Sequence, residues 1–343
     1  MPGALHPESP ARFWGFPRML LGLPSNLAVR NVSRTATFEE LCRVHGPTYV
    51  AHVWGLDGRH AELDEETILS PGSVGAACVA VGMCLDLVDD LMGGKASNAL
   101  ALVRPPGHHA LLDRGMGYCI FNNIACAAAH ARALGVKRIL VVDWDAHHGN
   151  GTEEYALRTP GVAYVSMHED ALFPQGTGTL VQLRPQGSII NIPLPAGAGD
   201  ADVTYALRTV VRVLANAFRP ELLLVSCGFD AHMADPMSSL TVTEVGFAAM
   251  TAIILEMAAQ HAAGRALFVL EGGYNPASLA ESLRRVAETL AGRIAPVVSG
   301  VVRDDVRALA DGLQGELARL YDCAQPAVST SREKAVLFAD PSS

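Results

Sequence analysis

Apolar and polar positions alternate along the chain in a way that predicts a parallel sheet covered by helices. From residue 98 onward, short blocks rich in Leu and β-branched residues are separated by longer Ala- and Leu-rich stretches. Each block is long enough for one buried strand, and strands that alternate with helices are typical of βαβ units. The predicted strands are 98–103, 138–143, 162–167, 188–194, 221–226 and 266–271.

The stretches between the blocks have helical length and end close to Gly or Pro, which often follow the C-terminus of a helix. They predict helices over 73–91, 121–134, 200–218 and 243–263. No repeat or long low-complexity linker divides the chain, so we predict one compact α/β domain over 1–323. Residues 324–343 show no clear period and are predicted to form a peripheral or flexible tail.

Reactive or glycine-rich segments follow five of the predicted strands. Because ligands bind at the carboxyl ends of strands in open α/β sheets, these loops are expected to converge on one site. The loops are RPPGHHA (104–110), WDAHHGNGT (144–152), HEDALFPQGTG (168–178), CGFDAHMADPMSSL (227–240) and GGYNP (272–276).

Asp143, Asp145 and His147 are spaced by two at the end of a strand, which places their side chains on one face. Carboxylate and imidazole groups are ligands that zinc accepts. Asp230 ends a second strand and is the expected third ligand, which would leave a fourth position open for water and substrate. In the structural alternative, Asp145 and Asp230 are loop caps and His147 is an ordinary polar residue.

Two further motifs offer proton transfer and oxyanion stabilisation at the same edge. His108 and His109 provide imidazoles that exchange protons near neutral pH, although a histidine pair is often ordinary surface chemistry. Tyr274 follows two glycines and can donate a hydrogen bond to an oxyanion, whereas a core tyrosine is the alternative interpretation.

Composition narrows the class of protein. The 343 residues are 50% hydrophobic and 18% charged, with a net charge of −9, so a basic nucleic-acid-binding face is not expected. No uninterrupted apolar run is long enough to cross a membrane, and the start lacks the order of a signal peptide. We therefore predict a cytoplasmic protein with no membrane association. Its seven cysteines are interpreted as reduced thiols.

Five motifs in order resemble those of the histone deacetylase superfamily, which includes class II deacetylases, bacterial histone deacetylase-like amidohydrolases and acetylpolyamine amidohydrolases. The likeness covers about residues 6–290. It implies the arginase/deacetylase fold, a single domain with a central, mostly parallel eight-stranded sheet and an active site at the carboxyl ends of its strands. Relatives generally have an additional strand before the HPESP motif (6–10). The motifs are RPPGHHA, MGYCIFNN, VVDWDAHHGNGT, GFDAHMADPM and EGGYN.

The resemblance also implies a role for each matching residue. Asp145, His147 and Asp230 match the ligands of one Zn²⁺, and Tyr274 matches the transition-state tyrosine. The remaining catalytic matches are His108, His109, Asp143 and Asn150. His109 is the expected general base and acid, Asp143 would orient His108, and Asn150 would partner His109. Family branches carry either Asp or Asn at the last position, which leaves the charge of His109 open.

The family likeness extends to a substrate channel and a second cation. The channel is expected at Gly117, Tyr118 and Phe173, with Met237 at its rim. A monovalent cation, usually K⁺, is expected at Asp143, Asp145, His147, Ser166 and Met167, in part through backbone carbonyls.

The predicted function is therefore zinc-dependent hydrolysis of the acetamide of acetylated amines. An acetylated lysine side chain is the first choice of substrate, and an acetylpolyamine or another small acylated amine is the alternative. A manganese-dependent arginase-like enzyme and a non-catalytic deacetylase-like binding protein are the rivals. Sequence leaves open whether the chain forms a homo-oligomer.

Overall fold

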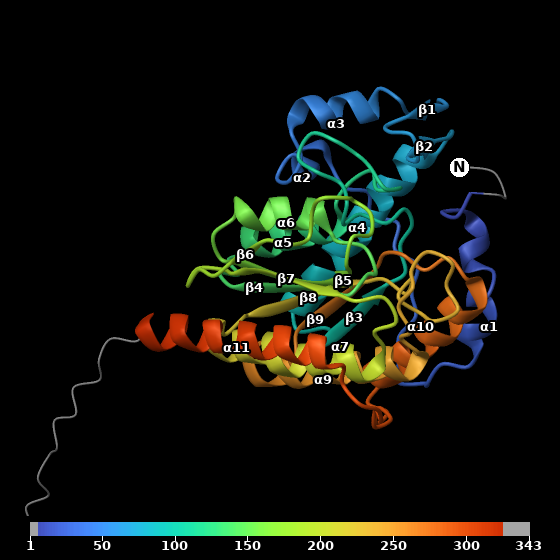
Figure 1. Ribbon diagram of the computed structural model, residues 1–343. Coiled ribbons are helices and arrows are strands. Elements are labelled where there is room, and N and C mark those ends of the chain that lie inside the picture. The colour runs from blue at the N-terminus through green and yellow to red at the C-terminus, as the bar shows by residue number, and fades with distance from the viewer. Residues whose placement is uncertain (1–5, 325–343) are drawn as a thin grey trace, which may run out of the picture.

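A seven-stranded sheet forms the centre of the computed structural model, which describes residues 6–324 (Figure 1). The strand order is β3-β9-β8-β4-β5-β7-β6. Every neighbouring pair is parallel except β6 and β7. The strands are β3 (Asn98–Ala101), β4 (Ile139–Asp143), β5 (Val162–Glu169), β6 (Val181–Gln182), β7 (Ile189–Leu194), β8 (Leu222–Cys227) and β9 (Ala266–Leu270). A separate antiparallel hairpin pairs β1 (Ala61–Glu62) with β2 (Ile68–Leu69).

All six apolar blocks are confirmed as strands, but the expected count of eight is wrong for the described part of the chain. The one sheet strand that was not predicted is β6. It has two exposed residues of mixed polarity, so no apolar pattern marks it. On the opposite edge, β3 pairs only with β9 among residues 6–324. An additional strand beyond β3 is therefore not part of the sheet over these residues.

Helices cover both faces of the sheet (Figure 1). Side chains of β4 alternate between them, because Leu140 and Val142 pack into one apolar cluster and Ile139 and Val141 into the other. The larger helices are α4 (Ser73–Met92) and α5 (Asn123–Ala133) on one face, and α9 (Glu244–His261), α10 (Pro276–Leu290) and α11 (Asp304–Ala324) on the other. The shorter helices are η1 (Pro10–Phe13), α1 (Phe16–Leu21), α2 (Phe38–Leu41), α3 (Pro47–Trp54), α6 (Asn150–Leu157), α7 (Asp200–Ala206) and α8 (Arg212–Phe218).

Capping side chains explain where several predicted helices begin. Asn122 accepts the Ala125 N–H at the start of α5, and Thr243 accepts the Val245 N–H at the start of α9. The single helix predicted over 200–218 is instead α7 and α8 joined by a π-helical segment, Leu207–Val211. Among residues 6–324, no helix combines the length and apolarity needed to cross a membrane.

The predicted tail, 324–343, lies outside the described residues except for residue 324, which ends α11. Residues 291–323 belong to the predicted domain but lie beyond residue 290, near which the family likeness ends. Helix α11 packs against α7, α8 and β7, and its Val306, Ala310, Leu313 and Leu317 belong to the main apolar cluster. The described C-terminal helix is therefore part of the same core as the sheet.

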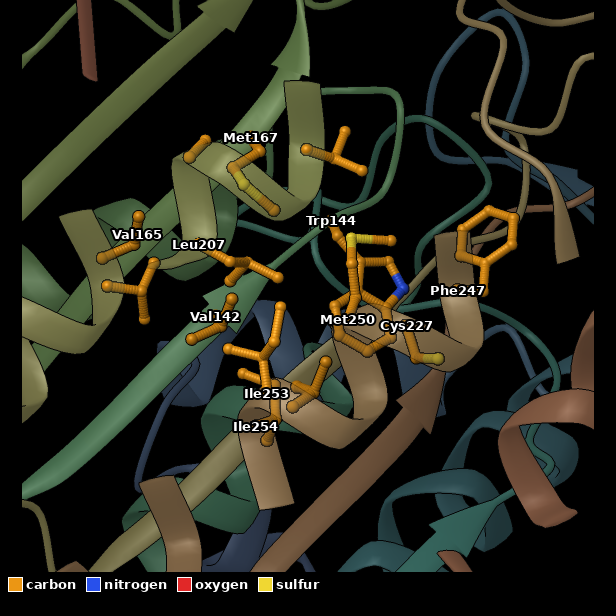
Figure 2. Close-up of a cluster of buried hydrophobic side chains, with 14 of the residues drawn as sticks. Val142, Trp144, Val165, Met167, Leu207, Cys227, Phe247, Met250, Ile253 and Ile254 are labelled. Carbon is orange, nitrogen blue, oxygen red and sulfur yellow. The ribbon is translucent and has the colours of Figure 1, made fainter. Parts of the chain in front are cut away.

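Side chains at the carboxyl end of β4 alternate between two sides, as the two-residue spacing predicts. Trp144 and Ala146 pack into the apolar cluster with Met167 and Cys227, and Figure 2 shows Trp144 among these side chains. β4 lies at a topological switch point, because the chain continues to β5 on one side while β8 pairs with β4 on the other. Loops after β4 and β8 meet there, which is where open α/β sheets form their binding crevice.

Candidate metal centre and active site

Three side chains from these two loops form a compact buried group. Nδ1 of His147 lies 3.1 Å from Oδ1 of Asp145 and 3.0 Å from Oδ2 of Asp230. One potential ligand atom from each residue lies within 4.8 Å of the others. Within residues 6–324, this is the one group of three or more His, Cys, Asp or Glu side chains with that geometry. Two of its members come from the loop after β4 and one from the loop after β8.

Backbone N–H groups hold the two carboxylates in place. Oδ1 of Asp230 accepts from the Ala146 N–H at 2.9 Å, and Oδ2 of Asp145 accepts from the Gly272 N–H at 2.8 Å. A side chain at Gly272 would collide with Oδ2 of Asp230, so glycine is required there for the loop after β9 to approach the site. Three loops therefore fix the orientation of the group.

The group has the electrostatic character of a cation site. Burial and the nearby Asp145 raise the pKa of Asp230, because two carboxylates repel each other where water does not screen them. Burial lowers the pKa of His147, but the Asp230 and Asp145 carboxylates outweigh burial and raise it to about 10. Two carboxylates and one imidazole are donors that a divalent metal ion accepts, and its charge would offset theirs. The residues therefore fit a metal ion.

His108 and His109 lie beside this group with ring centroids 4.0 Å apart. Nδ1 of His108 is 3.1 Å from Oδ2 of Asp143, and Nδ1 of His109 is 2.8 Å from Oδ1 of Asn150. An amide oxygen only accepts, so His109 donates from Nδ1 and keeps an accepting lone pair on Nε2. The His109 ring centroid is 6.1 Å from that of His147.

The two histidines have opposite electrostatic surroundings. Burial lowers the pKa of His108, but Asp145 and Asp143 outweigh burial and raise it to about 10. Burial, His108 and His147 together lower the pKa of His109 well below 6.5, although Asp145 and the hydrogen bond to Asn150 oppose them. His109 is therefore neutral at pH 7, which suits a proton acceptor.

Tyr274 supplies a neutral phenol in the same region. Burial raises its pKa well above 10, and Asp230 and Asp145 add to the rise while Arg12 opposes it. Its ring lies 5.9 Å from that of Tyr118 and 4.9 Å from the guanidinium carbon of Arg12. The hydroxyl keeps its proton and remains a hydrogen-bond donor.

Three of the four predicted channel residues, Gly117, Tyr118 and Phe173, lie beside His109 or Tyr274. The Phe173 ring packs edge-on against His109 with centroids 5.1 Å apart. A Cβ on Gly117 would lie 2.6 Å from His109 and 2.8 Å from Phe173, so Gly117 fits closely between them. The backbone N–H of Met237 donates a hydrogen bond to Oδ1 of Asp235 at 3.1 Å. Its position at the channel rim stays a prediction.

The residues predicted to bind a monovalent cation come from adjacent strands. Asp143 of β4 is in register with Ser166 of β5, and both are buried. The Ser166 hydroxyl bonds Nδ1 of His168 at 2.7 Å, and the Met167 side chain packs in the apolar cluster (Figure 2). A role for Met167 would therefore use its backbone carbonyl.

Sequence reasoning missed several buried charged residues around the site. Arg12 is 1% exposed and donates to the carbonyls of Glu271 and Gly273, the two residues on either side of Gly272. The Glu271 carboxylate accepts from the Gly107 and His108 N–H groups at 2.6 and 3.2 Å. The motifs HPESPAR and EGGYN contain these residues, but only the folded chain reveals their contacts.

This arrangement defines an α/β protein whose mostly parallel sheet presents a buried group of side chains suited to a metal ion, a neutral imidazole and a protonated phenol at one edge. The sequence profile of the histone deacetylase domain matches residues 6–290. The chain belongs to the histone deacetylase family. Family membership supports an amidohydrolase enzyme.

Individual relatives agree with this assignment. The chain is 38% identical over 291 residues to the histone deacetylase-like amidohydrolase of Pseudomonas aeruginosa, covering 83% of this chain and 75% of that protein. It is 37% identical over 303 residues to histone deacetylase 15 of Arabidopsis thaliana, with 84% and 53% covered. It is 39% identical over 288 residues to the human polyamine deacetylase HDAC10, with 79% and 42% covered.

A solved structure supports the fold. The crystal structure of the HDA15 HD domain aligns with a TM-score of 0.84 and 32% sequence identity, over 94% of this chain and 91% of that one. A mostly parallel α/β sheet flanked by helices is thus confirmed as the fold class.

Proposed function

We propose that the protein is a zinc-dependent deacetylase that hydrolyses the acetamide of acetylated amines, with the activity carried by a domain over 1–323. One observation carries the proposal: a buried group suited to a divalent metal lies beside a neutral His109 whose Nδ1–H is engaged by Asn150. A base with a free lone pair next to a metal site is the arrangement that metal-assisted hydrolysis needs.

Asp145, His147 and Asp230 would hold the zinc ion. Zinc when bound acts as a Lewis acid that polarises the amide carbonyl and lowers the pKa of water toward ~7. A single group of three ligands within residues 6–324 supports one metal rather than the two that an arginase-like enzyme would need.

The chain's own residues would move the protons. Nε2 of His109 accepts a proton from the attacking water, and the His109 imidazolium then returns it to the leaving amine. Water adds to the amide carbon to form a tetrahedral oxyanion, and the C–N bond then breaks to release acetic acid and the amine. The acid proton passes to the amine, so the products at neutral pH are acetate and an alkylammonium ion. Asn150 keeps the His109 tautomer fixed through the 2.8 Å hydrogen bond. Tyr274 donates its hydroxyl hydrogen to the oxyanion.

His108 would have an electrostatic role. His108 is protonated and lies between the Asp143 and Asp145 carboxylates. Its positive charge therefore faces these two carboxylates rather than the substrate. We also propose K⁺ at Asp143, Asp145, His147, Ser166 and Met167, supported by the register that sets Ser166 beside Asp143.

The substrate class is proposed as an acetylated lysine side chain. Gly117, Tyr118 and Phe173 would line the channel for its unbranched stem, since Gly117 packs tightly against His109 and Phe173. Met237 is apolar, whereas an acidic residue at the rim would favour a polycation. Acetylpolyamines remain the second candidate, because the polyamine deacetylase HDAC10 is 39% identical.

The test compares substrates on the zinc-loaded protein. Acetate release would be measured with an acetyl-lysine peptide, acetylputrescine and acetylspermidine, with Asp230→Ala as the blank. We expect turnover of the peptide in preference to both polyamines. Exclusive turnover of the polyamines would replace the leading substrate while retaining the chemistry, and no acetate release from any of them, with zinc bound, would favour a binding protein.

A further inference from the structure

Asp235 joins the loop that carries the metal ligand Asp230 to the loop that carries Tyr274. Oδ2 of Asp235 accepts from the Tyr274 N–H at 2.6 Å and from the Asn275 N–H at 3.0 Å. Oδ1 accepts from the Met237 N–H at 3.1 Å. One carboxylate thus binds three backbone N–H groups on two loops.

Other contacts connect the same two loops. The Phe229 N–H donates to the Gly272 carbonyl at 3.1 Å, and the Asn275 side chain donates to the Ala234 carbonyl at 2.8 Å. Asp235 differs from these contacts because its partner is the peptide unit of Tyr274 itself. It is also only 6% exposed, so water does not easily replace its hydrogen bonds.

We propose that Asp235 is a positioning residue, which sets the orientation of Tyr274 by holding its backbone while Met237 is held by the same carboxylate. The proposal rests on the proposed function, because it assigns Tyr274 the oxyanion contact. A hydroxyl donor is effective only where it meets the developing charge, and small displacements of catalytic groups reduce rate strongly.

Arg12 and Asp235 bind the two ends of the same peptide group, the one that links Gly273 to Tyr274. Arg12 contacts the Tyr274 ring and bonds the Gly273 carbonyl at 2.7 Å, which limits how the ring moves. Without Asp235, the N–H after that carbonyl would have no described acceptor, and the peptide linking Gly273 to Tyr274 would be held from one side. The Tyr274 hydroxyl would then lose its fixed direction.

The test is a double-mutant cycle with Asp235→Asn and Tyr274→Phe. Asparagine keeps the shape of the side chain but replaces one accepting oxygen with a donor. We expect Asp235→Asn alone to lower kcat by about 10–100-fold, the range found when residues that orient metal ligands are replaced, with little change in KM. In the Tyr274→Phe background the same substitution should change kcat less than about threefold, because the hydroxyl it positions is absent. An equal loss in both backgrounds would overturn the proposal.

Asp202→Asn is the matched control. Asp202 is also buried and accepts from two backbone N–H groups, those of Gly199 and Arg303, at 3.0 and 2.8 Å. This substitution should lower stability without changing kcat in either background. If Asp235→Asn does not fold, Asp235→Glu, which keeps the charge and moves it by one methylene, would enter the same cycle.

Hydrogen exchange separates failure of this proposal from failure of the proposed function. The amides of Tyr274 and Asn275 should exchange faster in Asp235→Asn than in the wild type, and remain protected in Asp202→Asn. This result does not depend on turnover. Unchanged exchange at both amides would overturn the positioning role even in an active enzyme, whereas a wild type without turnover would refute the deacetylase function alone.

Discussion

The two halves of the β4 segment are equally buried but are stabilised in different ways. Residues 139–142 are apolar and pack into the clusters on both faces of the sheet. Asp143, Asp145 and His147 follow directly and are buried to a similar degree. The apolar half gains stability from removal of its surface from water, and any well-packed neighbour suffices. The polar half needs a particular charge or hydrogen bond for every group.

We therefore expect the apolar residues of this segment to determine the stability of the fold and its polar residues to determine the reaction. Apolar substitutions inside the sheet should change the free energy of unfolding and leave the active-site groups in place. Substitutions at the carboxyl edge should change turnover and leave the core intact. Asp235 lies between these two cases, because it is buried and polar and accepts a hydrogen bond from the backbone of Tyr274, the proposed oxyanion donor.

The largest expected effect on folding comes from Leu224→Ala. Leu224 is fully buried in the middle of β8 and belongs to the cluster beneath α4 and α5. Truncation would leave a cavity and cost about 2–5 kcal/mol of unfolding free energy. Denaturant unfolding measures this loss, and metal stoichiometry should stay unchanged. Loss of bound metal in a folded Leu224→Ala protein would contradict the expectation that core substitutions leave the candidate metal site intact.

Tyr274→Phe should show the reverse behaviour. Removal of one oxyanion donor typically lowers kcat by ~10²–10³-fold, while the phenyl ring keeps the packing against Arg12. Steady-state kinetics would measure the loss, with metal content and thermal unfolding as controls. Full activity in this variant would refute the oxyanion role of Tyr274.

A smaller effect is expected from His45, a buried histidine that is not part of the candidate metal-binding group. Burial lowers its pKa to about 4, and its Nε2 accepts the Asn122 N–H at 2.9 Å. The unfolded chain, with a pKa near 6.5, binds the proton more readily between these values, so stability falls as pH drops below 6.5. We expect His45 to account for about 1 kcal/mol of the loss at pH 5.5.

His45→Gln tests this contribution, because glutamine retains a donor and an acceptor without titrating. Unfolding free energies measured between pH 7 and 5 should fall less steeply in the variant than in the wild type. Parallel curves would show that His45 does not contribute to acid sensitivity.

The sequence predicts most of the fold because the six main strands are apolar on both faces, and their helices end at Gly or Pro. β6 escapes prediction because two exposed residues carry no periodic pattern. The π-helical segment Leu207–Val211 was not predicted either, because it continues from α7 into α8 and no Gly or Pro interrupts it.

The candidate metal-binding group could be predicted from sequence because Asp145 and His147 are two residues apart and Asp230 follows β8, the strand that pairs with β4. The contacts of Arg12 and Asp235 could not. Arg12 bonds the Gly273 carbonyl, 261 positions along the chain, and Asp235 accepts from Tyr274, 39 positions away. Neither contact follows from local spacing, because each depends on how two segments that are distant in the sequence pack together.

Metal titration tests the proposed chemistry most directly. The protein would be stripped with a chelator, and acetate release from acetylated substrates would be followed as Zn²⁺ is added to the wild type and to Asp230→Ala. We predict that wild-type activity rises from the blank and saturates near one Zn²⁺ per chain, while the variant stays at the blank. Full acetate release by the stripped protein, or equal activity in Asp230→Ala, would contradict a metal-dependent deacetylase at this site.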